Sequence, residues 1–301
     1  MTNIKHRVIE DPIHGYRRLD PLPEATDIAQ FYESQYYHLI KQGNRAPEIR
    51  RLMESGPSTE REKSWLSTTL YGDIHAILTE EIGLKPAAFL DVGCGMGDLI
   101  DFLRKQGWKV SGLELSREAA KLAQDKGLDV YNTNLGRLAE EQPHLKNAFQ
   151  AVTFINVLEH VLDPALLLKQ VRTVLAPNGI VAIRVPNDFS ELQKHAQTAL
   201  GKDPWWVAIP DHVNYFDFKS LRHFLDKQGF ETVYQGGDFP MELFLLMGED
   251  YAGNPDVGGK VHEKRRRFEL AVSGSFRRNL YRQLAEIGVG RDCFIFAKAR
   301  G

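Results

Sequence analysis

Residues Phe89–Asp98, FLDVGCGMGD, decide the fold of this chain. An apolar run, Ala87–Val92, ends at three glycines with the spacing Gly-x-Gly-x-Gly, and an apolar helical pattern begins at Leu99. A glycine loop between a strand and a helix is the context that a nucleotide-binding site requires. Glycine permits the tight turn and lets a ligand touch bare backbone, while the helix start offers free N–H groups to an anion.

The alternation of strand and helix continues beyond this loop. Helical patterns separate most of the apolar runs, and the run Phe149–Asn156 is apolar almost throughout, as is typical of a strand covered on both faces. This repetition predicts an α/β fold with a doubly wound, seven-stranded, mostly parallel, Rossmann-like sheet. Its strands are expected at residues 87–92, 109–115, 129–131, 149–156, 180–185, 231–234 and 293–297.

The flanking segments depart from this alternation. Residues 1–86 are predicted to form an N-terminal helical lid or substrate-side segment. Residues 87–301 are predicted to form one ligand-binding domain with two insertions, at about 187–216 and 240–290.

Composition excludes several classes of protein. The 301 residues are 43% apolar and 26% charged, with a formal net charge of −2, so a collagen-like, largely disordered or nucleic-acid-coating chain is disfavoured. No apolar run is long enough to span a membrane, and the first residues lack the apolar core of a secretory signal. Cys94 and Cys293 are too few for a disulfide framework or a zinc site, so the expected setting is the reducing cytoplasm.

The charges beside the glycine loop limit which class of ligand can bind there. Asp98 stands where a dinucleotide fingerprint has its last glycine, and Asp91 turns a carboxylate toward the loop. A pyrophosphate would be repelled, whereas an amino acid that carries a sulfonium would not. Glu114, at the end of the next strand, can accept hydrogen bonds from both hydroxyls of a ribose. Together these residues indicate S-adenosylmethionine, and they disfavour an NAD-dependent oxidoreductase.

Over residues 87–185 the chain resembles class I S-adenosylmethionine-dependent methyltransferases of the small-molecule branch. The segment Phe149–Pro164, FQAVTFINVLEHVLDP, is similar to the fourth-strand motif of that branch, which includes the quinone O-methyltransferases. Residues 15–37 and 210–216 are more loosely similar to methyltransferases of glycan and natural-product biosynthesis. The resemblance implies S-adenosylmethionine as cofactor and S-adenosylhomocysteine as product.

The resemblance also assigns cofactor contacts to particular residues. Asn134 matches the usual adenine contact, although many relatives have Asp there, and Asn156 matches a position near the methionine moiety. Tyr32 and Tyr36 could close over the sulfonium through cation–π contacts, or could be core residues of a helix. The expected cofactor residues are Asp91, Gly93, Gly95, Gly97, Glu114, Asn134, Asn156, Tyr32 and Tyr36.

Methyl transfer to an alcohol gains from a general base, and histidine is the commonest one. His212 follows the fifth strand, where open α/β sheets bind ligands, and His160 follows the fourth; either could also be structural. Glu159 is expected to be a first-turn helix charge rather than a base. The expected acceptor contacts are Asn187, Trp205, Trp206 and Tyr215.

No metal site is expected, because strand four ends in Asn156 and only Asn187 and Asp188 follow strand five. The basic stretch 260–282 could bind a phosphorylated or nucleotide-linked acceptor, or could be a solvated helix face.

The sequence therefore predicts an enzyme, EC 2.1.1.-, that methylates a hydroxyl of a small molecule, a sugar or a nucleotide-linked sugar. Three alternatives stay open: a cofactor-binding regulatory module without catalysis, a methyltransferase acting on N or C of another natural product, and one acting on nucleic acid. Nucleic acid is disfavoured because Asn156 is not followed by Pro-Pro-aromatic. No oligomeric state is predicted.

Overall fold

The computed structural model describes residues 6–31, 40, 47–54, 56–209 and 211–300. The chain divides into two compact units, each made of segments that are separate in the sequence. The glycine-loop unit comprises Glu24–Ile155 and Ala165–Val181. The histidine unit comprises the residues up to Pro23, Asn156–Pro164 and Ala182–Arg300.

The glycine-loop unit is built on four parallel strands. β3 lies between β4 and β6, and β5 pairs with the other side of β4. The strands are Ala88–Val92 (β3), Lys109–Leu113 (β4), Val130–Tyr131 (β5) and Phe149–Ile155 (β6). The α-helices are Ala25–Gln30 (α1), Pro47–Met53 (α3), Pro57–Thr68 (α4), Leu70–Ala76 (α5), Asp98–Lys105 (α6), Arg117–Asp125 (α7), Leu135–Glu141 (α8) and Pro164–Val174 (α9), the last entering from the histidine unit. Shorter turns are the π-helix Ile77–Glu81 (η2) and the 3₁₀ turn Pro143–Leu145 (η3).

Local sequence explains how the helices of this unit begin. Ser116 caps α7 by accepting a hydrogen bond from the N–H of Ala119, as its position after a strand predicts. The apolar residues of α6, Leu99, Ile100 and Leu103, lie on one face and are buried. A side-chain cap therefore defines the start of α7, and a buried apolar face orients α6.

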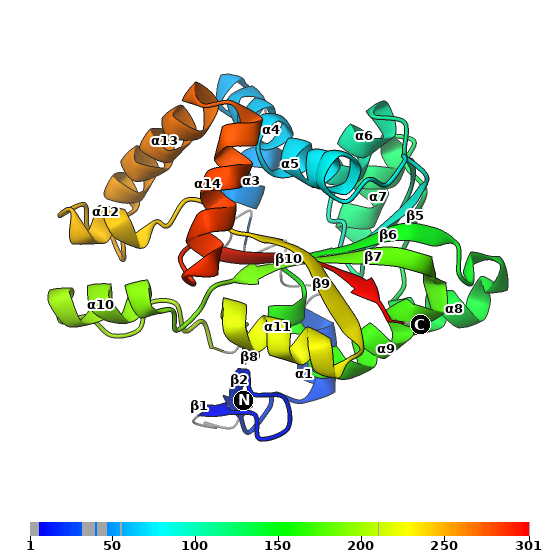
Figure 1. The fold of residues 1–301 in the computed structure, drawn as a ribbon, viewed down its shortest axis with the longest axis horizontal. Helices are drawn as coiled ribbons and strands as arrows, with labels where there is room; N and C mark the ends of the chain where they lie inside the picture. Colours follow the sequence, from blue (N-terminus) through cyan, green and yellow to red (C-terminus); the bar gives the residue numbers. More distant parts are fainter. Residues whose placement is uncertain (1–5, 32–39, 41–46, 55, 210, 301) are drawn as a thin grey trace. The chain divides into compact units, whose positions relative to one another are not determined.

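The whole sheet has seven strands in the order β5-β4-β3-β6-β7-β10-β9. Leu175–Pro186 (β7) is longer than predicted because it includes the expected turn at 177–179, where Asn178 has a φ of 63°. Phe230–Gly236 (β9) and Asp292–Ala299 (β10) form an antiparallel pair at one edge, shown in Figure 1 in yellow and red. The predicted class, a doubly wound and mostly parallel α/β sheet, is confirmed.

The histidine unit adds a small second sheet. Arg7–Glu10 (β1) pairs with Arg17–Asp20 (β2), which pairs with Asn214–Tyr215 (β8). Among the described residues of the N-terminal segment, these two strands precede the first helix, α1. Both strands are too short to show a clear alternation in the sequence, and β8, which pairs with β2, lies about 200 residues away in the chain.

Five α-helices and one 3₁₀ turn complete this part of the chain as described. The turn Leu158–His160 (η4) follows β6. The helices are Glu191–Leu200 (α10), Phe218–Lys227 (α11), Glu242–Leu246 (α12), Pro255–Ala271 (α13) and Gly274–Glu286 (α14). Helices α10 and α12 pack on each other, and both appear at the left of Figure 1. Segments from the two predicted insertions, 187–216 and 240–290, are therefore in contact.

Candidate active site

The glycine loop is tied to the neighbouring strand through its backbone. The N–H groups of Gly93 and Cys94 both donate to the carbonyl of Leu113, at 2.8 and 2.9 Å. Gly93, Gly95 and Gly97 have φ values of 76°, 55° and 79°, in the left-handed region that favours glycine. The three glycines are thus required by the turn itself, whatever ligand it holds.

Glu114 links the glycine loop to the start of α7. Its Oε2 accepts from the N–H of Gly95 at 2.9 Å, and its Oε1 accepts from the N–H of Ser116 at 2.8 Å. Burial raises the pKa of Glu114, and the backbone N–H groups of Ser116, Gly95 and Leu115 oppose that rise. A partly buried carboxyl group is therefore held at the end of β4, beside the loop, with its oxygens facing backbone donors.

Asp91 lies on the same edge at the end of β3. It is 4% exposed, and the hydroxyl of Thr153 on β6 donates to its Oδ1 at 2.6 Å. Burial, reinforced by the charge of Glu114, raises the pKa of Asp91 to about 7 against the hydrogen bond from Thr153. The unit therefore contains a carboxyl group that a cationic ligand would ionise.

Two asparagines follow β5. The side chain of Asn134 caps α8 by accepting from the N–H of Arg137 at 3.0 Å. Asn132, which sequence reasoning missed, donates to the carbonyls of Glu114 and Leu115 at 2.8 and 2.9 Å and so fixes the segment after β4. Asp91, Gly95 and Glu114 are brought together as predicted, whereas Tyr32 and Tyr36 lie outside the described residues.

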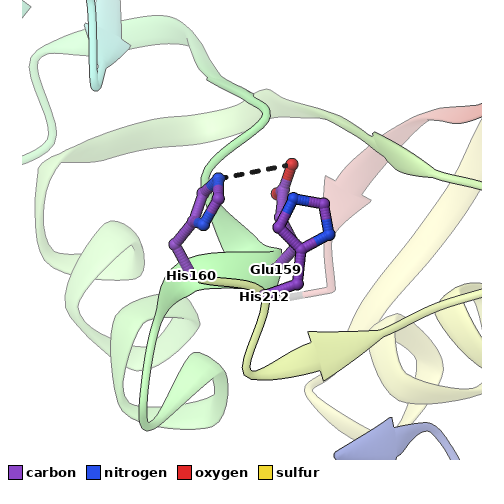
Figure 2. Close-up of side chains that lie close together, drawn as sticks. All are labelled: Glu159, His160 and His212. Carbon is purple, nitrogen blue, oxygen red and sulfur yellow. Dashed lines mark ion pairs between the residues drawn. The ribbon is translucent and has the colours of Figure 1, made fainter. Parts of the chain in front are cut away.

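The histidine unit brings three residues together that the sequence places in two segments. Figure 2 shows Glu159 and His160, which follow β6, with His212 from the connection before β8. The His160 and His212 rings are 4.9 Å apart and edge to face. Nε2 of His160 lies 3.8 Å from Oε1 of Glu159, the contact dashed in Figure 2.

The orientation of His160 is fixed by the backbone. Its Nδ1 lies 2.9 Å from the carbonyl oxygen of Asp211, which can only accept, so Nδ1 carries a proton and Nε2 faces Glu159. Asn214 holds the two segments together by donating to the carbonyls of Leu158 and Val161. Asn214 has no sequence signature as an anchor, because its role depends on a contact across 50 residues.

Glu159 lies in the first turn of the short helix η4, and its side chain is buried. It is 2% exposed, and burial raises its pKa well above the ordinary value. The nearby charges of Asp292 and Asp188 add to this rise. This burial, which the sequence did not indicate, arises because the residues after β6 form a short 3₁₀ turn that is covered by the chain around Val213, whose N–H donates to the Glu159 carbonyl.

The predicted acceptor residues have different surroundings. The amide of Asn187 donates to the carbonyls of Gly288 and Gly290, so it is already used within the fold. Trp205 and Trp206 pack edge to face, and Phe189 lies edge to face with both Trp206 and Tyr215. Trp206 and Tyr215 therefore belong to one aromatic cluster, in which Phe189 contacts both rings.

Asn156 follows β6 with a φ of 55°, and Nη1 of Arg184 donates to its Oδ1 at 3.0 Å. Arg184 also pairs with Asp238 and Asp292. The position predicted to lie near the methionine moiety is thus held by a buried charge network.

The donor atoms of Glu159, His160 and His212 all lie within 4.8 Å of one another. Two imidazole nitrogens and one carboxylate oxygen are a set that zinc or iron can take. This group was not predicted from the sequence, because its members lie in two separate segments and not at the ends of strands four and five. That the protein uses no metal stays a prediction.

The basic stretch 260–282 is neither an open anion site nor a solvated face throughout. Arg265 pairs with Asp238 and Glu269, and the guanidinium of Arg277 donates to the Glu269 carbonyl. Arg266, Arg277 and Arg278 are buried. Tertiary packing of α13 and α14 therefore uses these charges internally. No helix in the described part of the chain is long and apolar enough to cross a membrane.

The glycine loop, the acid at the end of β4 and the strand order with its antiparallel edge define the class I methyltransferase fold. A family model described as a methyltransferase domain matches residues 63–235, more than half of the chain. The chain belongs to this family. The predicted resemblance to small-molecule methyltransferases of class I is confirmed.

Two curated relatives carry the name ubiquinone biosynthesis O-methyltransferase. The chain is 37% identical over 99 residues to one from Albidiferax ferrireducens, which covers 31% of this chain and 38% of that protein. It is 33% identical over 201 residues to one from Idiomarina loihiensis, which covers 60% of this chain and 77% of that protein. The chain spans about half of the length of several curated relatives that it matches.

A solved structure supports the fold. The 1,6-didemethyltoxoflavin-N1-methyltransferase of Burkholderia thailandensis, solved with its substrate and S-adenosylhomocysteine, superposes with a TM-score of 0.53 at 15% identity. The match covers 99% of this chain and all of that one.

Proposed function

We propose that this protein transfers the methyl group of S-adenosylmethionine to a hydroxyl group of a small molecule, a sugar or a nucleotide-linked sugar. Family membership and the curated relatives, which are named as O-methyltransferases, support the reaction class. The observation that carries the choice of a hydroxyl is the pair His160 and His212 beside the buried Glu159. An alcohol needs a base, whereas an amine or carbanion gains less from one.

In this proposal the glycine-loop unit binds the cofactor. Asp91, when ionised, would meet the ammonium of the methionine moiety, and Glu114 would exchange a backbone partner for the ribose hydroxyls. Gly93, Gly95 and Gly97 would form the floor, with Asn134 and Asn156 as the remaining contacts. S-adenosylmethionine supplies an activated methyl group whose sulfur leaves as a neutral thioether, so no acid is needed for the leaving group.

The histidine unit would supply the base and hold the acceptor. His212 accepts the proton of the attacking hydroxyl, and His160, with its tautomer fixed by the Asp211 carbonyl, lies beside it to share that proton. Burial raises the pKa of Glu159 well above its ordinary value, and in its ionised form Glu159 would stabilise a neighbouring imidazolium. Alignment of the acceptor oxygen behind the methyl carbon supplies most of the rate enhancement.

We propose the domain roles in the same terms. Residues 87–301 form the cofactor-binding domain, with acceptor-binding insertions at about 187–216 and 240–290, and residues 1–86 form a lid or substrate-side segment. Trp205, Trp206 and Tyr215 contact the acceptor. Asn187 supports that site through its bonds to Gly288 and Gly290.

Methyl transfer from labelled cofactor tests the proposal. The full chain is incubated with S-adenosylmethionine labelled in the methyl group and with alcohols, phenols and amines, and the labelled product is identified by mass spectrometry. We expect O-methylated product from a hydroxylated acceptor. Failure to bind S-adenosylmethionine at micromolar concentration, or methylation of amines alone, would refute it.

A further inference from the structure

A group of buried polar side chains lies in the histidine unit beyond the two histidines. It consists of Asp188, Gln193, Glu242 and Arg291, called here the Asp188 cluster. The N–H of Asn187 donates to the Arg291 carbonyl at 3.0 Å, which sets Arg291 beside the end of β7. Gln193 and Glu242 come from α10 and α12, the helices that join the two insertions.

The orientation of Gln193 is fixed by a helix cap. Its Oε1 accepts from the N–H of Ser190, while the Ser190 hydroxyl accepts from the N–H of Gln193. The amide NH₂ therefore points away from the helix start. It lies near both carboxyl groups and acts to lower the pKa of Asp188 and of Glu242.

The charges of the Asp188 cluster do not balance. Two carboxyl groups share one guanidinium, and Nη1 of Arg291 stands 3.8 Å from Oε1 of Glu242, too far for a hydrogen bond. Burial raises the pKa of Asp188 to about 7 in spite of Arg291, and burial also raises the pKa of Glu242. The cluster can therefore accept protons or hydrogen-bond donors from a ligand.

Within the Asp188 cluster the groups are neighbours, but several of their polar atoms make no hydrogen bond of ordinary length and angle. Among the residues that the structure describes, both oxygens of Asp188, Nε2 of Gln193, Oε1 of Glu242 and Nη1 of Arg291 accept or donate no hydrogen bond. Asp188, Gln193 and Glu242 are each 1% exposed. Buried polar groups are nearly always satisfied, and leaving one unsatisfied is costly, so water or the polar groups of a ligand can meet these atoms.

Aromatic side chains complete the group. Nε1 of Trp206 is likewise buried without a hydrogen-bond partner among the described residues, and the Tyr215 hydroxyl is buried near the backbone of Ala208. Asp188 is close enough to Tyr215 to raise its pKa, after the larger effect of burial. Since the Tyr215 and His212 rings are 6.3 Å apart, the cluster is contiguous with the two histidines through Tyr215.

We propose that the Asp188 cluster, with Trp206 and Tyr215, is the subsite that binds the hydroxyl groups of a sugar ring in the acceptor. Hydroxyl groups donate and accept at once, and the cluster offers both carboxylate acceptors and amide, guanidinium and indole donors. A phosphate is disfavoured because two carboxyl groups face it. An apolar ring would leave the buried atoms unsatisfied. This assignment deepens the proposed function and rests on it.

Ligand-observed NMR tests the assignment directly. The full chain, saturated with S-adenosylhomocysteine, is mixed in turn with the methyl glycosides of glucose, galactose, mannose and rhamnose, and with catechol as a phenolic comparison. Saturation transfer reports binding at millimolar affinity without any turnover. Each measurement is repeated with Asp188→Asn, Glu242→Gln and Trp206→Phe. The first two variants keep the shape of the side chain, and the third keeps an aromatic ring.

Glu191→Gln is the matched control, because Glu191 lies on the same helix α10 but is exposed and pairs with Lys194. We expect at least one glycoside to bind, about tenfold or more weakly in the three cluster variants and unchanged in the control. Trp206→Phe removes the N–H donor and leaves both carboxyl groups in place, so it tests the subsite even if a carboxyl variant fails to fold.

Binding of no glycoside, or glycoside binding that survives in all folded cluster variants, would overturn the assignment and leave the cluster to ordered water. Binding of catechol alone would overturn it in favour of an aromatic acceptor. Failure of the proposed function looks different, because S-adenosylhomocysteine then does not bind, which is measured separately by calorimetry.

Discussion

The pH dependence of cofactor affinity should follow the ionisation of Asp91. This carboxyl group is buried, bonded to Thr153, and has a pKa raised to about 7. In the proposed complex its ionised form faces the ligand ammonium, so the cofactor binds the ionised protein best. Affinity should therefore increase as the pH rises toward and past 7.

The size of the effect follows from the pKa. When only the ionised form binds, the apparent Kd is the intrinsic Kd divided by the ionised fraction. With a pKa of about 7, that fraction is roughly 3% at pH 5.5 and roughly 75% at pH 7.5. The expected change in Kd is about 25-fold, or ~1.9 kcal/mol. Over this range the ligand's amino group stays largely protonated.

Isothermal titration calorimetry at pH 5.5, 6.5 and 7.5 measures this change for the wild type, Asp91→Asn and Asp101→Asn. Asp101 is the control because its ion pairs with Arg104 and Lys105 help to lower its pKa against burial, which keeps it ionised throughout. Asp91→Asn should bind at least tenfold more weakly at pH 7.5, with no remaining slope. Asp101→Asn should retain the slope of the wild type.

The stability of the ligand-free protein should depend on pH in the opposite direction. The pKa of Asp91 is raised from 3.8 to about 7, so the folded chain holds a proton that the unfolded chain loses between these values. Its ionisation therefore removes stability as the pH rises through that window, and Asp91→Asn should melt no lower than the wild type at pH 7.5. A slope that persists in Asp91→Asn, or affinity that falls as the pH rises, would refute the reasoning.

Three further predictions concern the loop, the base and metal. Gly97→Ala should lower the Tm by roughly 5–10 °C, because the φ of Gly97 is +79° and a Cβ would stand 2.5 Å from Cδ1 of Leu128. Gly127 is the control: its φ is +73°, but a Cβ there would meet open space. Gly127→Ala should therefore lower the Tm much less in the same melting assay. His212→Ala should lower kcat by about 10²- to 10⁴-fold in the labelled-methyl assay while the Kd for S-adenosylmethionine stays unchanged. Dialysis against EDTA should leave kcat unchanged.

Each of these three has an outcome that contradicts it. Equal losses of Tm for the two glycine variants would show that steric overlap at Gly97 does not matter. A His212→Ala enzyme with full kcat would exclude His212 as the base. If EDTA abolished activity and zinc restored it, Glu159, His160 and His212 would hold a metal ion.

The amino-acid sequence by itself determined the doubly wound sheet and the glycine loop. Period-two and period-3.6 apolar patterns are local, as are the cap at Ser116 and the left-handed turn that needs Gly93, Gly95 and Gly97. The pairing of Glu114 with the loop could also be predicted, because parallel strands bring their carboxyl ends to one edge.

Only the tertiary structure decided the burial of Glu159, the meeting of His160 with His212, and the Asp188 cluster. These contacts join segments that are 50 or more residues apart, through Asn214 and through the packing of α10 on α12. Charge patterns along the chain could not reveal them, since a carboxyl group in a turn has the same local sequence whether water or protein covers it. Burial is a property of the assembled chain, and it is burial that shifts these pKa values and leaves polar atoms in need of a ligand.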